Sequence, residues 1–377
     1  RGLGDVYKRQ ILNPLIVHIS EVDLSPESGM GRVGWHWRQA FERRGYEFLH
    51  LGPAQVGAVR HPSLFPQAAD RAYQKLQRAA SVLLVHEPAS GAFVHSSVPV
   101  VVVSHGIERR GWELVLQSKG GVNPETIKWR TRLLFPLWRL RQCDRGLRRA
   151  ELLLLINQED AAYAEKFYQR DSKDIYVFKN GVYPTQLSAS PAIDRPENLI
   201  TILFLGSWIE RKGIATLVNA AQILHQQGLA IKWLLAGVGV DDPGLILSDW
   251  PPEIHASVEI IPRFPLAMEA DLFARSDIFV LPSFFEGQPL ALLQAMAAGL
   301  CCITTDCCGQ RDLIRSGTNG LLYEPGNVAQ LVELIERCAI DRTLRLTLGE
   351  NAERSVANRR WETVSAEIVD RVEALLR

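Results

Sequence analysis

The sequence has few of the features that tie a protein to a membrane or to the secretory pathway. Among its 377 residues, no apolar run approaches the roughly 20 residues that a helix needs to cross a bilayer. The longest apolar stretches, Val98–Val103 and Leu152–Ile156, have the length of β-strands. The first apolar stretch, Ile11–Ile19, contains polar residues and a proline and lacks a small-residue cleavage site, so no secretory signal is expected. These absences predict a cytoplasmic protein.

Disulfide and metal-ligand spacings are also missing. The six cysteines include two adjacent pairs, Cys301–Cys302 and Cys307–Cys308, which is not the pattern of a secreted disulfide framework. Zinc sites favour cysteine pairs separated by two residues, and neighbouring residues of a strand point to opposite faces. We therefore expect reduced cysteines, with Cys301 and Cys302 inside a buried strand, and no metal site.

The chain has no net charge, although its two halves differ. It contains 42 basic and 42 acidic residues, with 47% hydrophobic and 22% charged residues, which excludes disordered, collagen-like and coiled-coil chains. Residues 1–195 hold 27 basic and 19 acidic residues, and the remainder holds 15 and 23. The basic half is expected to face an anionic ligand or surface.

Alternating apolar and amphipathic segments predict two α/β domains of similar size. Fully apolar strands separated by helices are typical of a doubly wound parallel sheet, covered on both faces. We predict one Rossmann-like domain over 11–183 and a second over 199–360, facing each other across a cleft. The segment 184–198, rich in proline and serine, is expected to be a linker, and 361–377 a helix that returns to the first domain. Residues 1–10 resemble a translated sequencing adapter and are treated as a non-native leader.

The expected elements follow from apolar runs and from a 3.6-residue period. In the first domain the expected strands are Leu15–Ile19, Glu47–Leu51, Ser81–Val85, Val98–Val103, Leu152–Ile156 and Ile175–Phe178, and the expected helices are Val33–Arg44, Ala68–Ala80 and Asp160–Tyr168. In the second domain the expected strands are Ile200–Leu205, Ile231–Ala236, Val258–Ile261, Ile278–Leu281 and Cys301–Thr304, and the expected helices are Ile214–Gln227, Ala267–Arg275, Leu290–Ala298, Val328–Arg337 and Glu362–Leu376. Ligands of such sheets bind beside the carboxyl ends of the strands, so the loops there are the candidate site.

The loop after Ile278–Leu281 has the residues of an anion-binding site. It ends at Pro289, where a missing N–H costs little, and a helix begins near Leu290 with free amides and a dipole that favour a phosphate. Gly287 permits close approach of the backbone to a ligand, and Glu286 can face the cleft. By itself the pattern fits a plain strand–loop–helix unit with a solvated glutamate equally well.

Three motifs in the second half carry a family resemblance. Residues 286–299 read EGQPLALLQAMAAG, residues 204–213 read FLGSWIERKG, and residues 317–326 read GTNGLLYEPG. Together they resemble the retaining GT-B glycosyltransferases of family four, the glycosyl transferases of group 1. The first resembles that family's E-x7-E signature with Gln294 in place of the second glutamate. The second resembles its strand–GR–x4–KG element with Ser207 in place of the arginine.

The first half is similar to this family in weaker motifs. Gly29-Met30-Gly31 follows the first strand, as the family's first glycine-rich loop does. Residues 101–108 (VVVSHGIE) resemble its strand–His–Gly element, and residues 180–182 (NGV) resemble the turn before its linker. The resemblance covers about residues 14–370.

The resemblance implies a GT-B fold and a hexosyl transfer with retention of anomeric configuration. The donor would be a nucleotide-diphosphate sugar, the acceptor a glycan, a lipid-linked molecule or a small molecule, and neither a metal nor a cofactor beyond the donor is implied. It implies catalytic roles for His105 and Glu286, where Glu286 orients the donor sugar and His105 lies near the donor sugar and the acceptor. The residues that it places around the donor are Gly31, Ser207, Arg211, Lys212, Arg263, Gly287, Gln288, Pro289, Leu290 and Gln294.

The residue types suit these roles. Lys212 supplies a positive charge for the diphosphate, and Arg211 is a candidate to replace the guanidinium missing at Ser207. Gln294 would contact the ribose hydroxyls as an uncharged acceptor. Glu108, Arg109, Arg110 and Trp112 follow His105 in one loop and are candidates for an acceptor site.

Ser207 and Gln294 leave other hypotheses open. One is a non-catalytic relative that binds nucleotide sugars or glycans, and another is an epimerase on the same fold. Residues 29–34 also fit the G-x-G-x-x-G pattern of nicotinamide-dependent oxidoreductases. Residues 21–28 separate that pattern from the first strand, however, and His50 and Gly52 stand where an acid is expected, so we disfavour this hypothesis.

Residues 128–149 form a basic segment with apolar side chains between the charges. Eight of these residues are basic and one is acidic. Such a segment suits peripheral contact with the inner, anionic face of a membrane, and the alternative is a helix pair that covers the sheet and keeps a solvated basic face. No recognition motif accompanies the charge, so nucleic-acid binding is not expected.

Overall fold

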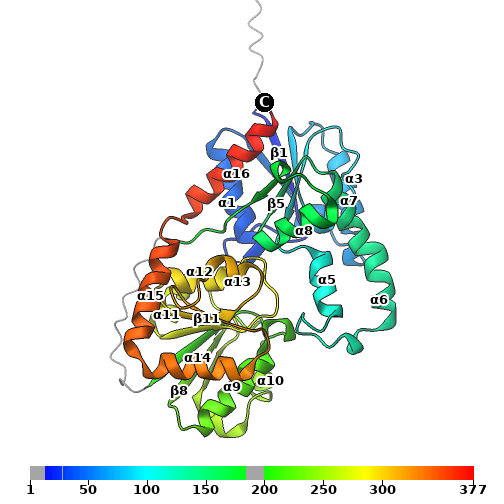
Figure 1. Cartoon of the computed structure of the whole chain (residues 1–377). Coiled ribbons are helices and arrows are strands. Elements are labelled where there is room, and N and C mark those ends of the chain that lie inside the picture. Colours follow the sequence, from blue (N-terminus) through cyan, green and yellow to red (C-terminus); the bar gives the residue numbers. More distant parts are fainter. Residues whose placement is uncertain (1–12, 28, 184–198) are drawn as a thin grey trace, which may run out of the picture.

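The computed structural model describes residues 13–27, 29–183 and 199–377, and these form two domains, one above the other in Figure 1. The predicted leader and linker lie outside the described residues. Each domain is built on a six-stranded parallel sheet with helices on both faces, which confirms the predicted pair of doubly wound domains. A right-handed crossover places its helix on one face of the sheet when strands are added in one direction and on the other face when the direction reverses. Because each strand order reverses once, helices cover both faces.

The two sheets have related strand orders. In the first domain the order is β2-β1-β3-β4-β5-β6, with bounds β1 Leu15–Ile19, β2 Glu47–Leu51, β3 Val82–His86, β4 Val100–Ser104, β5 Leu152–Leu155 and β6 Ile175–Val177. In the second domain the order is β12-β11-β10-β7-β8-β9, with bounds β7 Ile200–Leu205, β8 Ile231–Ala236, β9 Val258–Ile261, β10 Ile278–Leu281, β11 Cys301–Thr305 and β12 Leu321–Tyr323. The chain order reverses between β1 and β3 and between β7 and β10. Ligands of doubly wound sheets bind at such switch points.

Sixteen α-helices in the described part of the chain cover these sheets. Those of the first domain are α1 Gly29–Arg43, α2 Pro53–Val56, α3 Phe65–Gln74, α4 Glu87–Ser90, α5 Glu108–Leu116, α6 Trp129–Phe135, α7 Arg141–Arg149 and α8 Gln158–Tyr168. The later ones are α9 Ile214–Gln226, α10 Pro243–Leu247, α11 Glu269–Ala274, α12 Leu290–Ala297, α13 Cys308–Leu313, α14 Val328–Ile340, α15 Arg342–Val356 and α16 Trp361–Leu375. A π-helical turn, η3 (Pro136–Leu140), joins α6 to α7. None of the helices described is long and apolar enough to cross a membrane.

The predicted strands are all present to within two residues at their ends, and the helices differ more. The expected helix Ala68–Ala80 ends at Gln74, because the chain must leave it to reach the start of β3, where Ser81 N donates to Leu15 O at 2.7 Å. The helix α15 and the strand β12 were not expected. In α15 the helical period is obscured by polar residues and by Gly349, yet Asp341 caps it by accepting a hydrogen bond from Leu344 N at 2.9 Å.

The glycines of residues 29–34 lie inside a helix, which corrects the expectation of a glycine-rich loop there. Helix α1 begins at Gly29, four residues before the expected start at Val33. Gly31 is buried, and its carbonyl accepts a hydrogen bond from Ser25 N at 3.3 Å. The first turn of α1 thereby closes back on the loop that follows β1.

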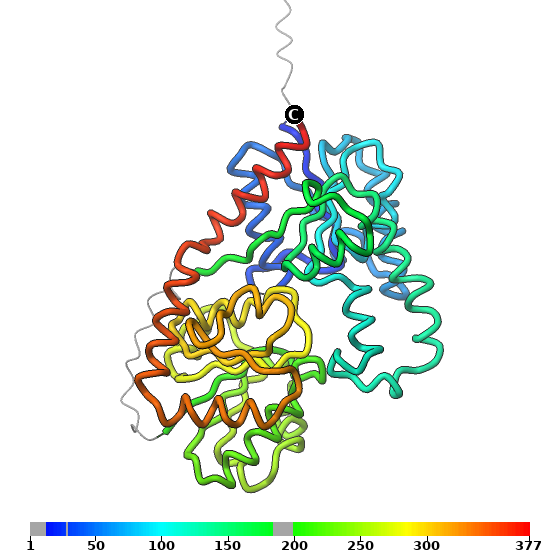
Figure 2. Tube along the Cα trace, in the orientation of Figure 1, coloured from blue at the N-terminus to red at the C-terminus, as the bar shows by residue number. Residues whose placement is uncertain are grey.

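The final helix α16 packs against α1 of the first domain. Figures 1 and 2 show its red segment running beside the blue α1. Trp361, at its start, is 2% exposed, and its ring stacks on that of His36 with centroids 4.3 Å apart. Arg44 pairs with Asp370 at 2.7 Å and with Glu373 at 3.2 Å on the solvent side. The chain therefore crosses between the two domains twice.

Four buried apolar clusters fill the space between sheets and helices, one on each face of each sheet. Cys301 belongs to the cluster on one face of the second sheet and Cys302 to the cluster on the other. All six cysteines are free. The strand alternation that predicted opposite orientations for Cys301 and Cys302 is thus observed.

Removing the Trp361 ring should loosen the docking of α16. We expect Trp361→Ala to lower the free energy of unfolding by about 3–5 kcal/mol, because it leaves a cavity between α16 and α1. The matched control is Trp129→Ala, since Trp129 is 69% exposed and should change stability by less than about 0.5 kcal/mol. Equal losses in both variants, measured by urea denaturation, would contradict the role given to Trp361.

Candidate functional site

A cleft of about 1040 Å³ separates the carboxyl ends of the two sheets. Eleven of the twelve predicted site residues line it: His105, Ser207, Arg211, Lys212, Arg263, Glu286, Gly287, Gln288, Pro289, Leu290 and Gln294. Gly31 does not line it, although its neighbours Gly29, Met30 and Arg32 do. The volume suits a ligand larger than most single-ring metabolites. The roles of these residues remain predictions at this point.

The loop over 282–289, between β10 and α12, lies against the first domain. A Cβ atom at Gly287 would sit 2.1 Å from the carbonyl oxygen of His105, so no other residue fits there without moving the backbone. Asn157 Nδ2 donates to Gly287 O at 3.2 Å across the same contact. The close approach that only glycine allows therefore brings the two halves of the candidate site together.

The side chain of Gln288 forms hydrogen bonds at this contact between the domains. Its Oε1 accepts a hydrogen bond from Asn180 N at 2.7 Å, and its Nε2 donates to Ile156 O at 3.3 Å. Asn180 Nδ2 also donates to Gln288 O at 3.1 Å. The side chain of Gln288 thus holds the loop in place, and its backbone remains the part predicted to contact the donor.

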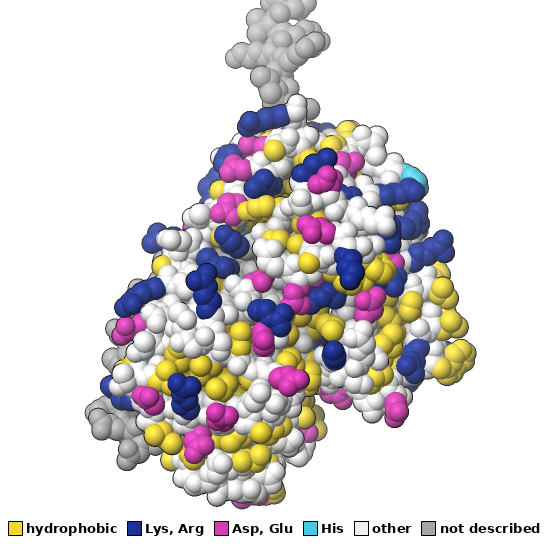
Figure 3. Space-filling view, viewed as in Figure 1, with side chains coloured by type: hydrophobic (Ala, Val, Ile, Leu, Met, Phe, Trp, Pro, Cys, Tyr) yellow, Lys and Arg dark blue, Asp and Glu magenta, His cyan; other side chains and the backbone are white. Residues whose placement is uncertain are grey.

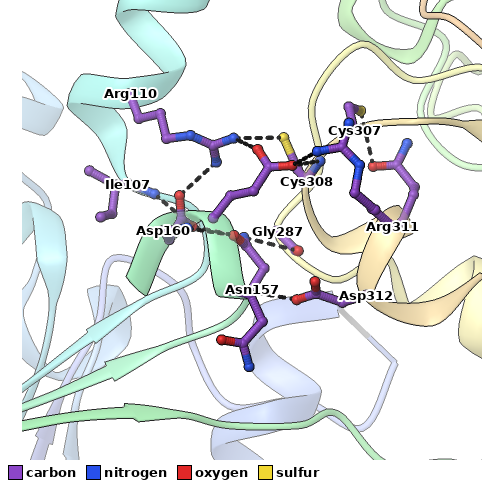
Figure 4. Close-up of polar contacts among 12 residues, drawn as sticks. Ile107, Arg110, Asn157, Asp160, Gly287, Cys307, Cys308, Arg311 and Asp312 are labelled. Atoms are coloured by element: carbon purple, nitrogen blue, oxygen red, sulfur yellow. Dashed lines mark hydrogen bonds and ion pairs between the residues drawn. The ribbon is translucent and has the colours of Figure 1, made fainter. Parts of the chain in front are cut away.

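Charged groups extend the contact on one side, as Figure 4 shows. Glu159 Oε1 accepts from Cys308 N at 2.9 Å and from Arg311 Nη1 at 2.6 Å, both of the second domain. Arg110 pairs with Glu159 and with Asp160, whose Oδ1 is 2.8 Å from Arg110 Nη1. Buried or half-buried pairs of this kind fix geometry more than they stabilise.

Three charged residues of the proposed acceptor loop are therefore occupied elsewhere. Arg110 faces the domain contact, Arg109 Nε donates to Asp144 Oδ1 at 2.8 Å, and Glu108 accepts from Arg139 at 2.9 Å. Trp112 does line the cleft, where its ring lies 4.9 Å from that of Phe135. Of this group, Glu108 and Trp112 line the cleft, and Glu108 does so while it is paired with Arg139.

Glu286, Lys212 and Arg211 form one charged cluster in the wall of the cleft. Glu286 Oε1 lies 2.6 Å from Lys212 Nζ and 3.2 Å from Arg211 Nη1. Burial opposes ionisation of Glu286, but the ammonium of Lys212 and the guanidinium of Arg211 outweigh it and leave the pKa of Glu286 below its usual value. Arg211 Nη1 also donates to Phe285 O at 2.5 Å. Two motifs far apart in the sequence thus converge on a single carboxylate.

Lys212 reaches this position because the chain turns sharply after it. Gly213 has φ +72°, the left-handed region, and a Cβ there would lie 2.0 Å from Pro282 O. The short 3-10 turn η6 (Glu210–Lys212) is thereby pressed against the end of β10. The K-G pair of the motif is therefore needed both for charge and for backbone geometry.

Helix α12 points its N-terminus at the cleft. Pro289 is the residue before its first turn, and Leu290 and Ala291 line the cleft. The first amides of a helix have no partner within it, and they carry part of the helix dipole. An anion between these amides and Lys212 would be favoured.

Gln294 lines the cleft together with two charged residues, Glu269 and Arg32. Its Nε2 donates to both oxygens of Glu269 at 2.9 Å, and Glu269 Oε1 is 3.8 Å from Arg32 Nη1 of the first domain. All three side chains are buried and all three residues line the cleft. Neither Glu269 nor Arg32 stands out in the sequence, because an acid in a short amphipathic helix and an arginine after a glycine are both ordinary. The missing acid at position 294 was the one hint that another carboxylate could be nearby.

Ser207 and Arg263 lie at the edges of the cleft. Ser207 is exposed. The side chain of Arg263 is 73% exposed, and its Nε is 3.1 Å from Asp241 Oδ1. Exposed pairs of this kind are weak, so Arg263 can move toward a ligand at little cost.

His105 belongs to a row of histidines behind the cleft that sequence reasoning missed. His18 Nδ1 lies 2.9 Å from His50 Nδ1, and His18 Nε2 lies 3.0 Å from His86 Nε2. The ring of His105 is 5.1 Å from that of His86, and His105 Nε2 is buried with no hydrogen-bond partner among the described residues. Burial lowers the pKa of His105 to about 4, so it is neutral at pH 7. A neutral ring can accept or donate one hydrogen bond at the cleft, depending on its tautomer.

Within the described ranges, no group of three or more His, Cys, Asp or Glu side chains could hold a metal ion.

Most of the second domain matches a family of known proteins. Residues 188–355 match the family described as "Glycosyl transferases group 1". The match includes both charged loops, those of Lys212 and Glu286. The family match therefore supports, independently, the resemblance noted for these motifs.

Curated relatives match about half of the chain. The lipopolysaccharide glucosyltransferase WaaG of Escherichia coli K12 is 28% identical over 213 residues, which is 53% of this chain and 56% of WaaG. The chain spans about half the length of the curated relatives it matches.

Solved structures match nearly the whole chain. Sucrose-phosphate synthase from Thermosynechococcus elongatus superposes with a TM-score of 0.78 over 96% of this chain and 99% of that chain, at 18% identity. The structure of WaaG gives 0.73 over 94% and 98%, at 18% identity. HepE of Anabaena in complex with UDP-glucose gives 0.64 over 96% and 99%, at 16% identity. The chain has the GT-B fold, as predicted.

The histidine row makes stability depend on pH. Burial lowers the pKa values of His18, His50, His86 and His105, so the unfolded chain binds protons below pH 6.5 that the folded chain does not. We expect the free energy of unfolding to fall as the pH falls from 6.5 toward 4, by about 1.4 kcal/mol per pH unit for each histidine that stays neutral. Burial raises the pKa of Glu87 to about 8, so the folded chain holds one proton there that the unfolded chain releases. This group therefore opposes the effect of the histidines on stability.

Urea denaturation at pH 7.5, 6.0 and 5.0 measures this slope. His61→Gln is the control, because His61 is exposed and pairs only with the neighbouring Ser63 among the described contacts. Its slope should equal that of the parent chain. A stability that stays flat between pH 7.5 and 5.0 would refute burial of neutral histidines.

Proposed function

We propose that the protein is a glycosyltransferase that moves a sugar from a nucleotide-diphosphate sugar to a carbohydrate or lipid-linked acceptor, in polysaccharide biosynthesis. The observation that supports it most is the convergence of Lys212, Arg211 and Glu286 with the N-terminus of α12 on one wall of the cleft. This wall suits a diphosphate, and the carboxylate beside it suits sugar hydroxyls. The family match of the same loops and the UDP-glucose bound in the HepE structure also support this proposal.

In this proposal the diphosphate lies between Lys212 and the first amides of α12. As the bond between sugar and phosphate breaks, negative charge grows on the leaving diphosphate. Fixed cations and amide dipoles aimed at that charge stabilise it, a contribution on the order of several kcal/mol. Lys212 exchanges its contact with Glu286 for the phosphate, and Arg211 remains to neutralise Glu286. The proposal needs neither a metal nor a cofactor besides the donor.

Glu286 and the backbone of Gly287 would then orient the donor sugar. His105 lines the same cleft, and its Nε2 has no hydrogen-bond partner among the described residues. In this proposal His105 contacts the sugar or the acceptor hydroxyl. We further propose that the transfer retains the anomeric configuration, by attack on the same face that the diphosphate leaves. Proton NMR of the first product formed reads the anomeric coupling directly, and an inverted product would overturn this part alone.

The competing hypothesis is a relative that binds nucleotide sugars without turnover. Release of free nucleotide from UDP-, GDP- or ADP-sugars in the presence of candidate acceptors separates the two, since binding without release would favour the competitor. An epimerase would change the sugar without releasing nucleotide. A nicotinamide-dependent oxidoreductase would need the glycines of residues 29–34 in a phosphate loop, whereas they lie within α1.

Loss of the Lys212 charge should weaken donor binding. We expect Lys212→Ala to raise the Kd for the nucleoside diphosphate that binds best among UDP, GDP and ADP by about tenfold or more. Lys212→Arg, which keeps the charge, should retain part of the affinity. Lys232→Ala is the control, because Lys232 of the strand β8 pairs with Glu259 of β9, away from the cleft. Isothermal titration gives the three values, and unchanged affinity in Lys212→Ala would remove the phosphate role.

We also propose that an arm of the first domain touches an anionic membrane surface. The arm consists of α5, α6 and η3, and it extends beside the cleft on the right of Figure 1. Its inner side lines the cleft with Trp112, Val115 and Phe135. Its outer side exposes large apolar side chains that recur every one to four residues: Trp129, Leu133, Leu134, Leu137 and Trp138, each 52–69% exposed.

Charge complementarity favours a membrane as the partner of this outer side. Exposed cations flank the apolar side chains along α6 and α7: Lys128, Arg130, Arg132, Arg141, Arg145, Arg148 and Arg149. Figure 3 shows hydrophobic and basic side chains together on the right-hand edge, where Figure 1 places α6. The earlier alternative, a helix pair that covers the sheet, holds for α7, whose Cys143 and Leu147 are buried, and not for α6. Basic amphipathic segments with tryptophan bind anionic interfaces in this way.

Vesicle binding tests this proposal. We expect the protein to sediment with vesicles of phosphatidylglycerol and phosphatidylethanolamine, and less with phosphatidylcholine or in 0.5 M salt. The variant Trp129→Ser/Leu133→Ser/Leu137→Ser should bind at least about tenfold more weakly. The control Leu245→Ser/Ile340→Ser removes equally exposed side chains of the second domain and should bind like the parent. Equal binding of both variants would show that the arm is not the contact.

A further inference from the structure

Besides Glu286, a second buried carboxylate lies in the cleft wall beside α12. Glu269, at the start of α11, is 4% exposed and lines the cleft together with Leu290, Ala291 and Gln294. Both of its oxygens accept hydrogen bonds of 2.9 Å from Gln294 Nε2. Arg32 of the first domain pairs with it at 3.8 Å, and Arg32 is itself fixed by donating to Pro26 O at 2.7 Å. The carboxylate is thus held from both domains.

The pairing explains why position 294 carries an amide. A glutamate there would set two carboxylates within hydrogen-bond distance, and one of them would have to stay protonated. Glutamine instead donates to Glu269, so Glu269 is the only one of these two positions that carries a carboxylate. This chain therefore keeps one acid at this place, on α11 rather than on α12.

The distance of this pair from the proposed diphosphate site matches the distance between the diphosphate and the ribose of a nucleotide. Gln294 lies four residues after Leu290 on the same helix, about 6 Å along the helix axis. A ribose follows its diphosphate at this scale. A fixed carboxylate is the group that proteins use to bind the vicinal hydroxyls of ribose.

We propose, on the basis of the proposed function, that Glu269 accepts the hydrogen bonds of the 2′- and 3′-hydroxyls of the donor nucleotide. Gln294 is a positioning residue, because it acts through Glu269. Arg32 extends the ribose pocket to the first domain, so nucleotide binding and the arrangement of the domains are coupled. In this proposal the residue that recognises ribose is Glu269 of α11, and the amide of Gln294 allows Glu269 to stay ionised beside α12.

Calorimetric titration with UDP, GDP and ADP and with their 2′,3′-dideoxy analogues tests this assignment. The parent chain should prefer the ribonucleotide by about tenfold to a hundredfold, since hydrogen bonds to a charged acceptor are lost in the analogue. Glu269→Gln should reduce that preference to less than about threefold and leave the affinity for the dideoxy form nearly unchanged. Gln294→Ala should lower the preference in the same way, and Gln294→Glu should lower it further at pH 8 than at pH 5.5. Glu253→Gln, at an exposed glutamate of the same domain, should behave like the parent.

The outcomes separate this inference from the proposed function. If Glu269→Gln weakens both nucleotide forms equally, or lowers the melting temperature so that neither binds, Glu269 is a structural link between the domains and the inference falls. If the parent binds a nucleotide without preferring ribose, the inference falls and the donor site stands. If the parent binds none of the three nucleotides, both fall.

Discussion

The structure depends on the contact between the loop over 282–289 and the first domain. At Gly287 there is no room for a side chain, since a Cβ would lie 2.1 Å from His105 O. Gln288 fills the adjoining space and is bonded to Asn180 and Ile156. With the loop fixed in this way, Glu286 can face the cations of the neighbouring turn, and α12 can aim its first amides into the cleft. The geometry of the candidate site is therefore a consequence of how the two domains meet.

The charges of the structure are arranged more finely than a count over the two halves of the sequence. The basic half is expected to face an anionic ligand or surface, whereas the cations beside the proposed diphosphate site, Lys212 and Arg211, come from the half with fewer basic residues. In the first half, Arg109, Arg110 and Arg139 are bound to carboxylates inside the domain or at its contact. The excess positive charge remains on the exposed surface of α6 and α7. A count of charges along the sequence shows which half has a surplus of positive charge, but it does not show which face of the structure carries that surplus.

Local patterns were sufficient for the strands other than β12 and for the motif loops of the second domain. Each buried strand is an apolar run bounded by turns, and the parallel order makes the loop after β10 meet the loop after β7. The helix α15 was missed because its period is weak without its tertiary contacts. The partners of Gln288 and Gln294 were missed because they come from segments far away in the sequence. The histidine row was missed for the same reason, since His18, His50 and His86 lie on three separate strands.

The coupling of the cleft to both domains has a consequence for how a ligand would act. Arg32 reaches Glu269 from α1, and α1 is held by α16, which is the direct continuation of the second domain past α15. A nucleotide that binds Glu269 competes with or reinforces this pair, and either effect changes the energy of the domain arrangement. The same movement would shift the arm of α5 and α6 relative to the donor wall, because the arm belongs to the first domain. Donor binding and access for an acceptor that arrives along the arm would then be linked through one ion pair, and Arg32 rather than a loop would be the residue on which that linkage depends.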